Sequence, residues 1–262
     1  MSNSNSQNNE LVQVIGSGNA FHSSGRAHAC YLAQWPRMDG SSVRMLIDFG
    51  ATSLYRLNQL DISPNSVSAL FLTHFHGDHM AGVPFLLLHF LYIEKRDSIF
   101  TIIGPPGVEA KVRELSECMY PGIELDLPLE FLELTGNATY EGARLEARPV
   151  NHRPESVALR LGFPSGNRFA FSGDAAFDSL LWDALSDTDL AIMELSVADL
   201  PADGKPIAHV SLEELEKNRE KIRTRRLIVS HIYDELAASV RKTNSFRPGF
   251  AEAAFDGLVL NF

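Results

Sequence analysis

The chain has 262 residues, of which 45% are hydrophobic and 21% charged, the balance of an ordinary globular chain with a sizeable core. This composition excludes a disordered or fibrous chain, and two cysteines can supply neither a disulfide framework nor a four-cysteine zinc site. The net charge of −10 argues against a general binder of polyanions.

The polar N-terminal segment and the longest apolar stretch of the chain argue against a targeting signal and a membrane span, respectively. Residues Met1–Glu10 are rich in Ser, Asn and Gln and lack a basic residue, so we expect a short disordered tail. The longest apolar stretch, Val83–Ile93, is too short to span a bilayer. We therefore expect a cytoplasmic protein with no membrane partner, in which residues 11–262 form a single domain.

The first half of the chain alternates β-rich runs with apolar or amphipathic helical segments, separated by glycine turns. In chain order we expect strands at Leu11–Gly16, His28–Gln34, Val43–Phe49 and Ala69–Thr73, a helix at Gly82–Arg96, a strand at Ser98–Ile103 and a helix at Val108–Met119.

The second half repeats this alternation. We expect strands at Leu145–Asn151, Ser156–Phe163 and Arg168–Phe171, a helix at Ser179–Ser186 and a strand at Leu190–Leu195. A Ser-x-x-Glu capping box opens the next expected helix, which runs from Ser211 to about Thr224. A strand at Leu227–Ser230, a helical turn at Ala251–Ala254 and a strand at Leu258–Asn261 are expected to follow. Two β-rich runs, each followed by helices, predict an α/β fold layered as an αββα sandwich.

The segment directly after the strand at Ala69–Thr73 reads His-Phe-His-Gly-Asp-His. In extended backbone His74 and His76 project to the same side, and Gly77 permits a turn that sends Asp78 and His79 in another direction. Three imidazoles and a carboxylate within six residues suit a borderline divalent metal, zinc first. This segment is therefore our strongest candidate for a metal site.

Four ligands in so short a loop cannot all reach one ion comfortably, so we expect partners from other strand ends. His152 follows one predicted strand, Asp174 follows the next but one, and His231 follows the strand at Leu227–Ser230. Each of these residues alone has a plain structural role, as a turn residue, a helix cap or a polar strand end. Their common position, where an apolar strand meets a loop, favours a shared site.

The run THFHGDH, the later His152, the SGD at 172–174 and the SHIYDEL that contains His231 resemble the metallo-β-lactamase superfamily from about Val12 to Leu260. The elements GSGNAF, LIDFG, MELS and AFDGLVL are closest to its ribonuclease Z-like and cyclic-phosphodiesterase-like branch. The resemblance implies a four-layer αββα sandwich that binds two divalent ions. It implies that His74, His76 and His152 hold one ion, that Asp78, His79 and His231 hold the other, and that Asp174 bridges both.

Further roles follow from the same resemblance. The ions are expected to be zinc, with manganese and iron as alternatives, and to generate a metal-bound hydroxide. Asp78, His209 and Glu194 are the candidate catalytic residues, with His209, oriented by Glu194, protonating the leaving group. The sequence around His209 departs from the His-x-Thr or His-Ser-Thr element of similar proteins, and the alternative is that His209 only helps to open the following helix. Asp48 is expected to hydrogen-bond the metal loop or a ligand imidazole.

The expected function is a dinuclear metal-dependent hydrolase, a phosphodiesterase acting on small phosphodiesters or cyclic nucleotides. Only 21 residues separate His152 from Asp174, which leaves no room for an RNA-binding arm, so extended nucleic acid is not an expected substrate. The alternatives are a hydrolase of a lactone, thioester or sulfate ester, a ribonuclease that processes transfer-RNA 3′ ends, and a non-catalytic metal-binding protein. The sequence leaves a homodimer open.

Overall fold

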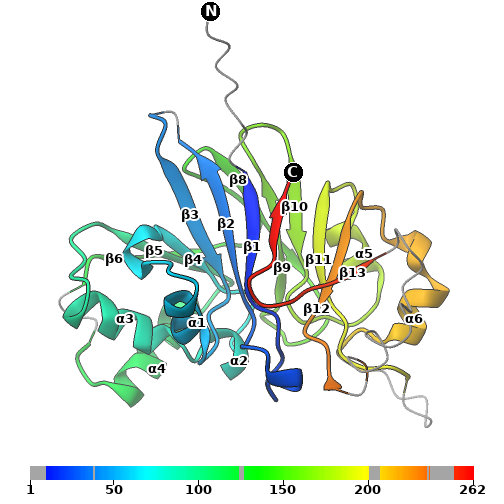
Figure 1. The fold of residues 1–262 in the computed structure, drawn as a ribbon, viewed down its shortest axis with the longest axis horizontal. Coiled ribbons are helices and arrows are strands. Elements are labelled where there is room, and N and C mark those ends of the chain that lie inside the picture. The colour runs from blue at the N-terminus through cyan, green and yellow to red at the C-terminus, as the bar shows by residue number, and fades with distance from the viewer. Residues whose placement is uncertain (1–9, 38, 124–126, 201–206, 235, 237–250) are drawn as a thin grey trace, which may run out of the picture.

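The computed structural model describes all residues except 1–9, 38, 124–126, 201–206, 235 and 237–250. Its described strands form two mixed seven-stranded sheets, ordered β14-β1-β2-β3-β4-β5-β6 and β13-β12-β11-β10-β9-β8-β7. The sheets lie face to face in the middle of the molecule (Figure 1).

The first sheet comes from the first half of the chain and one strand of the C-terminal segment. It contains β1 (Leu11–Gly16), β2 (Cys30–Pro36), β3 (Ser42–Ile47), β4 (Ala69–Phe71), β5 (Phe100–Gly104), β6 (Leu129–Glu133) and β14 (Val259–Asn261).

The second sheet comes from the second half. It contains β7 (Asn137–Tyr140), β8 (Ala143–Pro149), β9 (Val157–Gly162), β10 (Arg168–Phe171), β11 (Leu190–Glu194), β12 (Leu227–Ser230) and β13 (Glu252–Ala253).

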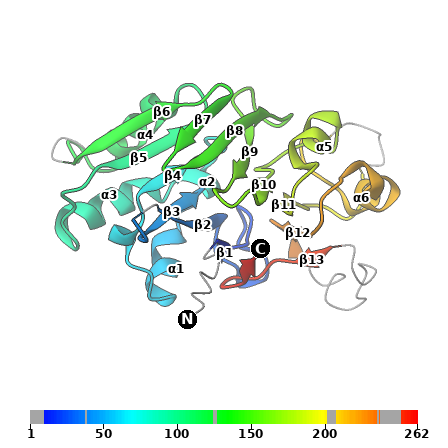
Figure 2. The same cartoon turned by 90° about the horizontal axis from the view of Figure 1, so that it is seen from above.

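Helices cover the outer face of each sheet (Figures 1 and 2). The first sheet carries α1 (Ser53–Gln59), α3 (Val83–Tyr92) and α4 (Val108–Met119), and the second carries α5 (Ser179–Leu185) and α6 (Leu212–Lys217). The short helix α2 (Gly77–Met80) belongs to the loop after β4, and 3-10 turns span Ser23–Gly25, Pro64–Ser66 and Arg219–Lys221.

Three apolar clusters match these layers. One lies between the sheets and includes Trp35, Phe71 and Phe169, and the other two lie between each sheet and its helices. An apolar face on both sides of each sheet is what the near-continuous hydrophobic strands of this sequence require. The predicted αββα sandwich is thus confirmed.

Strand direction brings many loops to one edge of the sandwich. In the first sheet β3, β4 and β5 run parallel. In the second sheet β10, β11 and β12 run parallel, and β8 shares their direction because β9 is antiparallel to both β8 and β10. The loops that follow β4, β8, β10, β11 and β12 therefore leave the sheets in the region where ligands bind to open sheets.

Several expected elements differ from the structure. The helix that begins after Ser211 ends at Lys217 rather than near Thr224, because the Asn218 side chain donates to the Glu214 carbonyl oxygen and its backbone leaves the helical region. The helical turn expected at Ala251–Ala254 is wrong, since Glu252 and Ala253 form β13 beside β12. Helix α1 and strands β6 and β7 are elements that the sequence pattern does not predict.

The expected tail also needs a correction at one residue. Positions 1–9 lie outside the described residues, but Glu10 is buried and its carboxylate accepts hydrogen bonds from Ser165 and Asn167. Glu10 thus belongs to the folded part of the chain. Within the described residues, no helix is long and apolar enough to cross a membrane.

Candidate metal centre

Asp48 organises the loop that carries the histidine motif. It follows β3 directly in a left-handed conformation (φ 57°) and is fully buried. Its carboxylate accepts hydrogen bonds from the Thr73 backbone N–H and hydroxyl, at 2.8 and 2.9 Å, and lies 2.7 Å from Nδ1 of His79. This contact leaves Nε2 of His79 to face the site, the arrangement expected of a metal-binding imidazole. The expectation for Asp48 is confirmed for both the loop backbone and the imidazole.

The motif itself turns into a helix earlier than expected. His74 follows β4 and is fully buried, and His76 is the N-cap of α2. Gly77 begins α2 with Asp78 and His79 in its single turn, so a helical turn, rather than a glycine turn of positive φ, redirects these two side chains.

The first cluster of candidate ligands joins this motif to the loop after β8. Its nitrogen and oxygen atoms lie within 4.8 Å of one another, in His74, His76, His152 and Asp174. Nε2 of His152 lies 3.1 Å from Nδ1 of His76, while Nδ1 of His152 lies 2.8 Å from the Ala208 carbonyl oxygen. Because that carbonyl can only accept, it places the proton of His152 on Nδ1 and leaves Nε2 as a lone-pair donor.

The second cluster has the same size and shares Asp174 with the first. It contains Asp78, His79, Asp174 and His231. Nε2 of His231 lies 3.2 Å from Asp78 and 3.6 Å from Asp174, and Nε2 of His79 lies 3.3 Å from Asp174. The seven candidate ligands therefore lie in two groups of four that have Asp174 in common.

Unsatisfied atoms test whether this arrangement fits metal ions. Nε2 of His74, Nε2 of His79 and Oδ1 of Asp174 are buried and have no hydrogen-bond partner of adequate geometry, although Nε2 of His79 and Oδ1 of Asp174 lie 3.3 Å from each other. Buried polar atoms are normally paired, so three orphaned atoms distributed over the two clusters point to missing partners. Imidazole nitrogens with carboxylate oxygens are the donor set of zinc and similar divalent ions, so the residues fit such ions.

The electrostatics of the two clusters also favour a cation. Burial holds the pKa of His74 well below its ordinary range. Burial acts the same way on His79, but the carboxylates of Asp174 and Asp48 outweigh it and raise the pKa of His79. Burial alone would raise the pKa of Asp174, yet the neighbouring His231 and His79 keep it well below its ordinary value. Asp174 is thus an ionised carboxylate surrounded by buried imidazoles.

The candidate acid and its partner are also brought together. Nδ1 of His209 lies 3.0 and 3.2 Å from the two carboxylate oxygens of the buried Glu194, and the His209 ring lies beside that of His152 at a centroid distance of 4.9 Å. Burial opposes protonation, but the Glu194 contact outweighs it and raises the pKa of His209 from 6.5 to about 9. His209 is therefore a protonated side chain at the edge of the clusters.

Ser196 is a site residue that sequence reasoning missed. Its hydroxyl donates to Glu194 and lies 3.1 Å from Nδ1 of His231 and 3.5 Å from Nδ1 of His209. Ser196 thereby connects the acid pair to a candidate ligand. The only sequence signal was its place in the MELS run, which begins within β11 and ends two residues after it.

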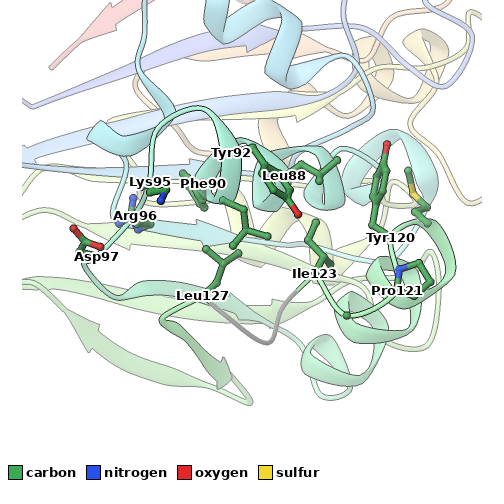
Figure 3. Close-up of a pocket in the computed structure, with 13 residues that line it drawn as sticks. Leu88, Phe90, Tyr92, Lys95, Arg96, Asp97, Tyr120, Pro121, Ile123 and Leu127 are labelled. Carbon is green, nitrogen blue, oxygen red and sulfur yellow. The ribbon is translucent and has the colours of Figure 1, made fainter.

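Of two cavities in the described part of the chain, one adjoins the candidate metal centre and the other does not. A cavity of about 890 Å³ has His152 in its wall. Another, of about 690 Å³, lies between the C-terminal ends of α3 and α4 (Figure 3). The described residues that line the latter include neither His nor Cys, and its buried Arg96 donates to the backbone oxygens of Ser98 and Ile99. This remote cavity is not part of the metal centre.

Solved structures identify the fold class. YhfI of Bacillus subtilis, described as a metallo-β-lactamase fold protein, superposes with a TM-score of 0.75 at 18% identity over 96% of this chain and 99% of its own. A diphosphatase of the PhnP family gives a TM-score of 0.74 at 19% identity over 97% and 98% of the two chains. The chain has the metallo-β-lactamase fold, as expected.

Sequence comparisons then identify the family. Ribonuclease Z of Aeropyrum pernix is 30% identical over 190 residues, which cover 70% of this chain and 53% of the relative. The chain spans about half or less of the length of the ribonuclease Z relatives it matches. The profile of the family described as Anti-Pycsar protein Apyc1 matches residues 11–253, and the chain belongs to this family. These relatives confirm the expected ribonuclease Z-like branch of the superfamily.

Proposed function

We propose that this protein is a dinuclear metal-dependent hydrolase that cleaves small phosphodiesters, cyclic nucleotides among them. The observation that carries the proposal is the pair of four-residue clusters that share Asp174 and contain three orphaned buried donor atoms. Zinc is the expected ion, with manganese and iron as alternatives. The names of the ribonuclease Z relative and of the diphosphatase among the structural neighbours support hydrolysis of a phosphorus–oxygen bond.

Each cluster would hold one ion, and Asp174 would contact both. When bound, two such ions lower the pKa of a water molecule and neutralise charge on the phosphoryl oxygens. A phosphodiester is the natural substrate for this arrangement, since its charge is concentrated on those oxygens.

The chain's own residues perform the remaining steps. Asp48 and the Ala208 carbonyl orient His79 and His152 through their Nδ1 atoms. His209, kept protonated by Glu194, donates a proton to the departing oxygen, and Ser196 maintains the orientation of Glu194. Asp78 is proposed to serve both as a metal ligand and as a catalytic residue. Its carboxylate lies 3.2 Å from Nε2 of His231.

Substrate size separates this proposal from its nearest rival. The ribonuclease Z relatives bear the name of an RNA-processing enzyme, and this chain covers only part of their length. The 21 residues between His152 and Asp174 are occupied by β9, β10 and their short connections, so this interval holds no arm. With a net charge of −10, extended RNA lacks a broad electrostatic partner.

The direct test compares kcat/KM on bis(nitrophenyl) phosphate with kcat/KM on a structured transfer-RNA precursor at physiological salt. We expect turnover of the small diester with little or no cleavage of the RNA. Efficient, position-specific RNA cleavage would move the assignment to a transfer-RNA 3′-processing ribonuclease.

A panel of chromogenic lactones, thioesters and sulfate esters, run beside the diester, distinguishes the other ester classes, which the same metal chemistry could serve. If metal-loaded protein hydrolysed nothing in either set, a non-catalytic metal-binding role would replace the proposal.

A further inference from the structure

The cavity beside His152 lies where three loops of the second sheet meet. Its walls come from the β8–β9 loop, from the segment between β10 and α5, and from Leu200, Ile207 and Ala208, which lie between β11 and α6. Its volume of about 890 Å³ lies within the range of pockets that bind small organic ligands. Among the described lining residues His152 is the one candidate ligand, so the cavity adjoins the candidate metal centre at this side chain.

One wall of this cavity is apolar. Leu180 and Leu200 are 41% and 39% exposed. Removing their apolar surface from water on ligand binding would be favourable. Phe177 and Ile207 extend this wall, and the ring of Phe177 packs edge-on against Trp182 at 5.7 Å. We call Phe177, Leu180, Leu200 and Ile207 the apolar wall.

The acidic side chains of the cavity are already engaged. Oδ1 of Asp178 accepts hydrogen bonds from the first turn of α5, and Oδ2 of Asp178 accepts from Asn151 at 2.5 Å. Glu214 is bound to Ser211 in the capping box of α6. The charge that remains exposed among the described lining residues is the guanidinium of Arg153. The cavity therefore offers several large apolar side chains beside one guanidinium and two hydrogen-bonded carboxylates, and the apolar side chains suit an uncharged ring attached to a phosphate.

A backbone contact links this cavity to the candidate metal centre. Ile207 and Ala208 line the cavity, and the Ala208 carbonyl oxygen accepts from Nδ1 of His152. A group packed against Ile207 therefore rests on the same short segment that orients His152. The segment that lines the cavity is therefore hydrogen-bonded to a candidate ligand.

We propose that this cavity binds the uncharged aromatic substituent of the substrate, and that the apolar wall makes aromatic phosphate esters better substrates than alkyl ones. The inference rests on the proposed function, because the phosphate must lie at the metal centre for its substituent to reach the wall. Leu180 and Leu200 are the specificity-determining residues, since they present the most exposed apolar surface.

The test measures binding rather than turnover. The probes are phenylphosphonate and methylphosphonate, which share a phosphonate group and differ in the ring, titrated calorimetrically into zinc-loaded protein. We expect phenylphosphonate to bind at least about tenfold more tightly, the effect of burying part of one ring. Leu180→Asn and Leu200→Asn should each reduce that preference by about three- to tenfold while leaving methylphosphonate affinity unchanged.

Ile93→Asn is the matched control, because Ile93 is 73% exposed at the end of α3, outside both the cavity and the metal centre. It should leave the preference intact, and Leu180→Met should retain it. Equal affinity for the two phosphonates, or an unchanged preference in both Asn variants, would overturn the role of the cavity while the proposed hydrolase stands. If neither phosphonate bound and no phosphodiester were hydrolysed, the proposed function would fall, and this inference with it.

Discussion

Replacing Glu194 with Gln should lower kcat at alkaline pH, because it lowers the fraction of His209 that is protonated there. Glu194 contacts His209 with both carboxylate oxygens and raises its pKa from 6.5 to about 9. Gln preserves the shape and can still accept the 2.7 Å hydrogen bond from the Ala175 backbone, but it removes the charge. The pKa of His209 should then fall towards its ordinary value.

The magnitude follows from the two pKa values. A raised pKa means that the protonated form is present at low pH and is lost as the pH rises through that pKa. At pH 8 about 90% of His209 is protonated with a pKa near 9 and about 3% with a pKa of 6.5, a difference of about thirtyfold. At pH 6 the two differ by less than about twofold. Bound cations lower the pKa of His209 in the parent protein and in the variant together. The pH range in which the two proteins differ therefore moves to lower pH but remains.

The assay is kcat between pH 5.5 and 9 for the parent protein, Glu194→Gln and His209→Ala, on an alkyl and a nitrophenyl phosphodiester. His209→Ala should lower kcat on the alkyl diester by about 10²–10⁴ at unchanged metal content. Both losses should shrink with nitrophenolate, which needs little protonation to leave. Equal losses at every pH and on both substrates would refute the acid role and assign His209 to the entry of the α6 helix.

Three further predictions concern a candidate ligand, a glycine that packs against the metal loop and an ion-paired carboxylate on β8. Asp174→Ala should lower metal content more than substitution of any other candidate ligand, because it alone belongs to both clusters; an equal loss from single-cluster variants, measured by elemental analysis, would contradict this. Gly50→Ala should lower both metal affinity and the unfolding temperature, since a Cβ there would lie 2.1 Å from the Asp78 backbone oxygen; parent-like values in calorimetry would contradict the claim. Glu146 is partly buried, which would raise its pKa, but Arg148 and neighbouring arginines lower it below 4.5. Its stabilisation is therefore present above pH 4.5 and lost as the pH falls below it, so the unfolding free energies of the parent and Glu146→Gln should converge in acid; a constant difference from pH 7 to pH 3 would contradict this.

Much of the fold followed from local patterns. Buried strands such as Arg168–Phe171 and Leu227–Ser230 have the predicted boundaries because continuous apolar runs bounded by turn residues have few other solutions. The wrong predictions concern segments whose secondary structure is determined by tertiary contacts. Glu252 and Ala253 are too few to form a helix of their own, and the unpaired edge of β12 provides hydrogen bonds that a helical turn does not.

The candidate site was predictable as a set of residue types at strand ends, but not as a geometry. His152 and His231 could be proposed because each follows an apolar strand, yet the division into two clusters came only from the family resemblance. The contacts of Ser196 and of the Ala208 carbonyl depend on residues brought together from distant parts of the chain. A backbone oxygen has no sequence signature, so no pattern could have identified it.

The central claim is that the seven residues of the two clusters bind two ions at once. Elemental analysis of folded protein, purified without added metal and dialysed free of loose ions, tests this most directly. The geometry predicts two divalent ions per chain, with zinc the most abundant. One ion per chain, or none, in protein that still unfolds cooperatively would contradict the claim.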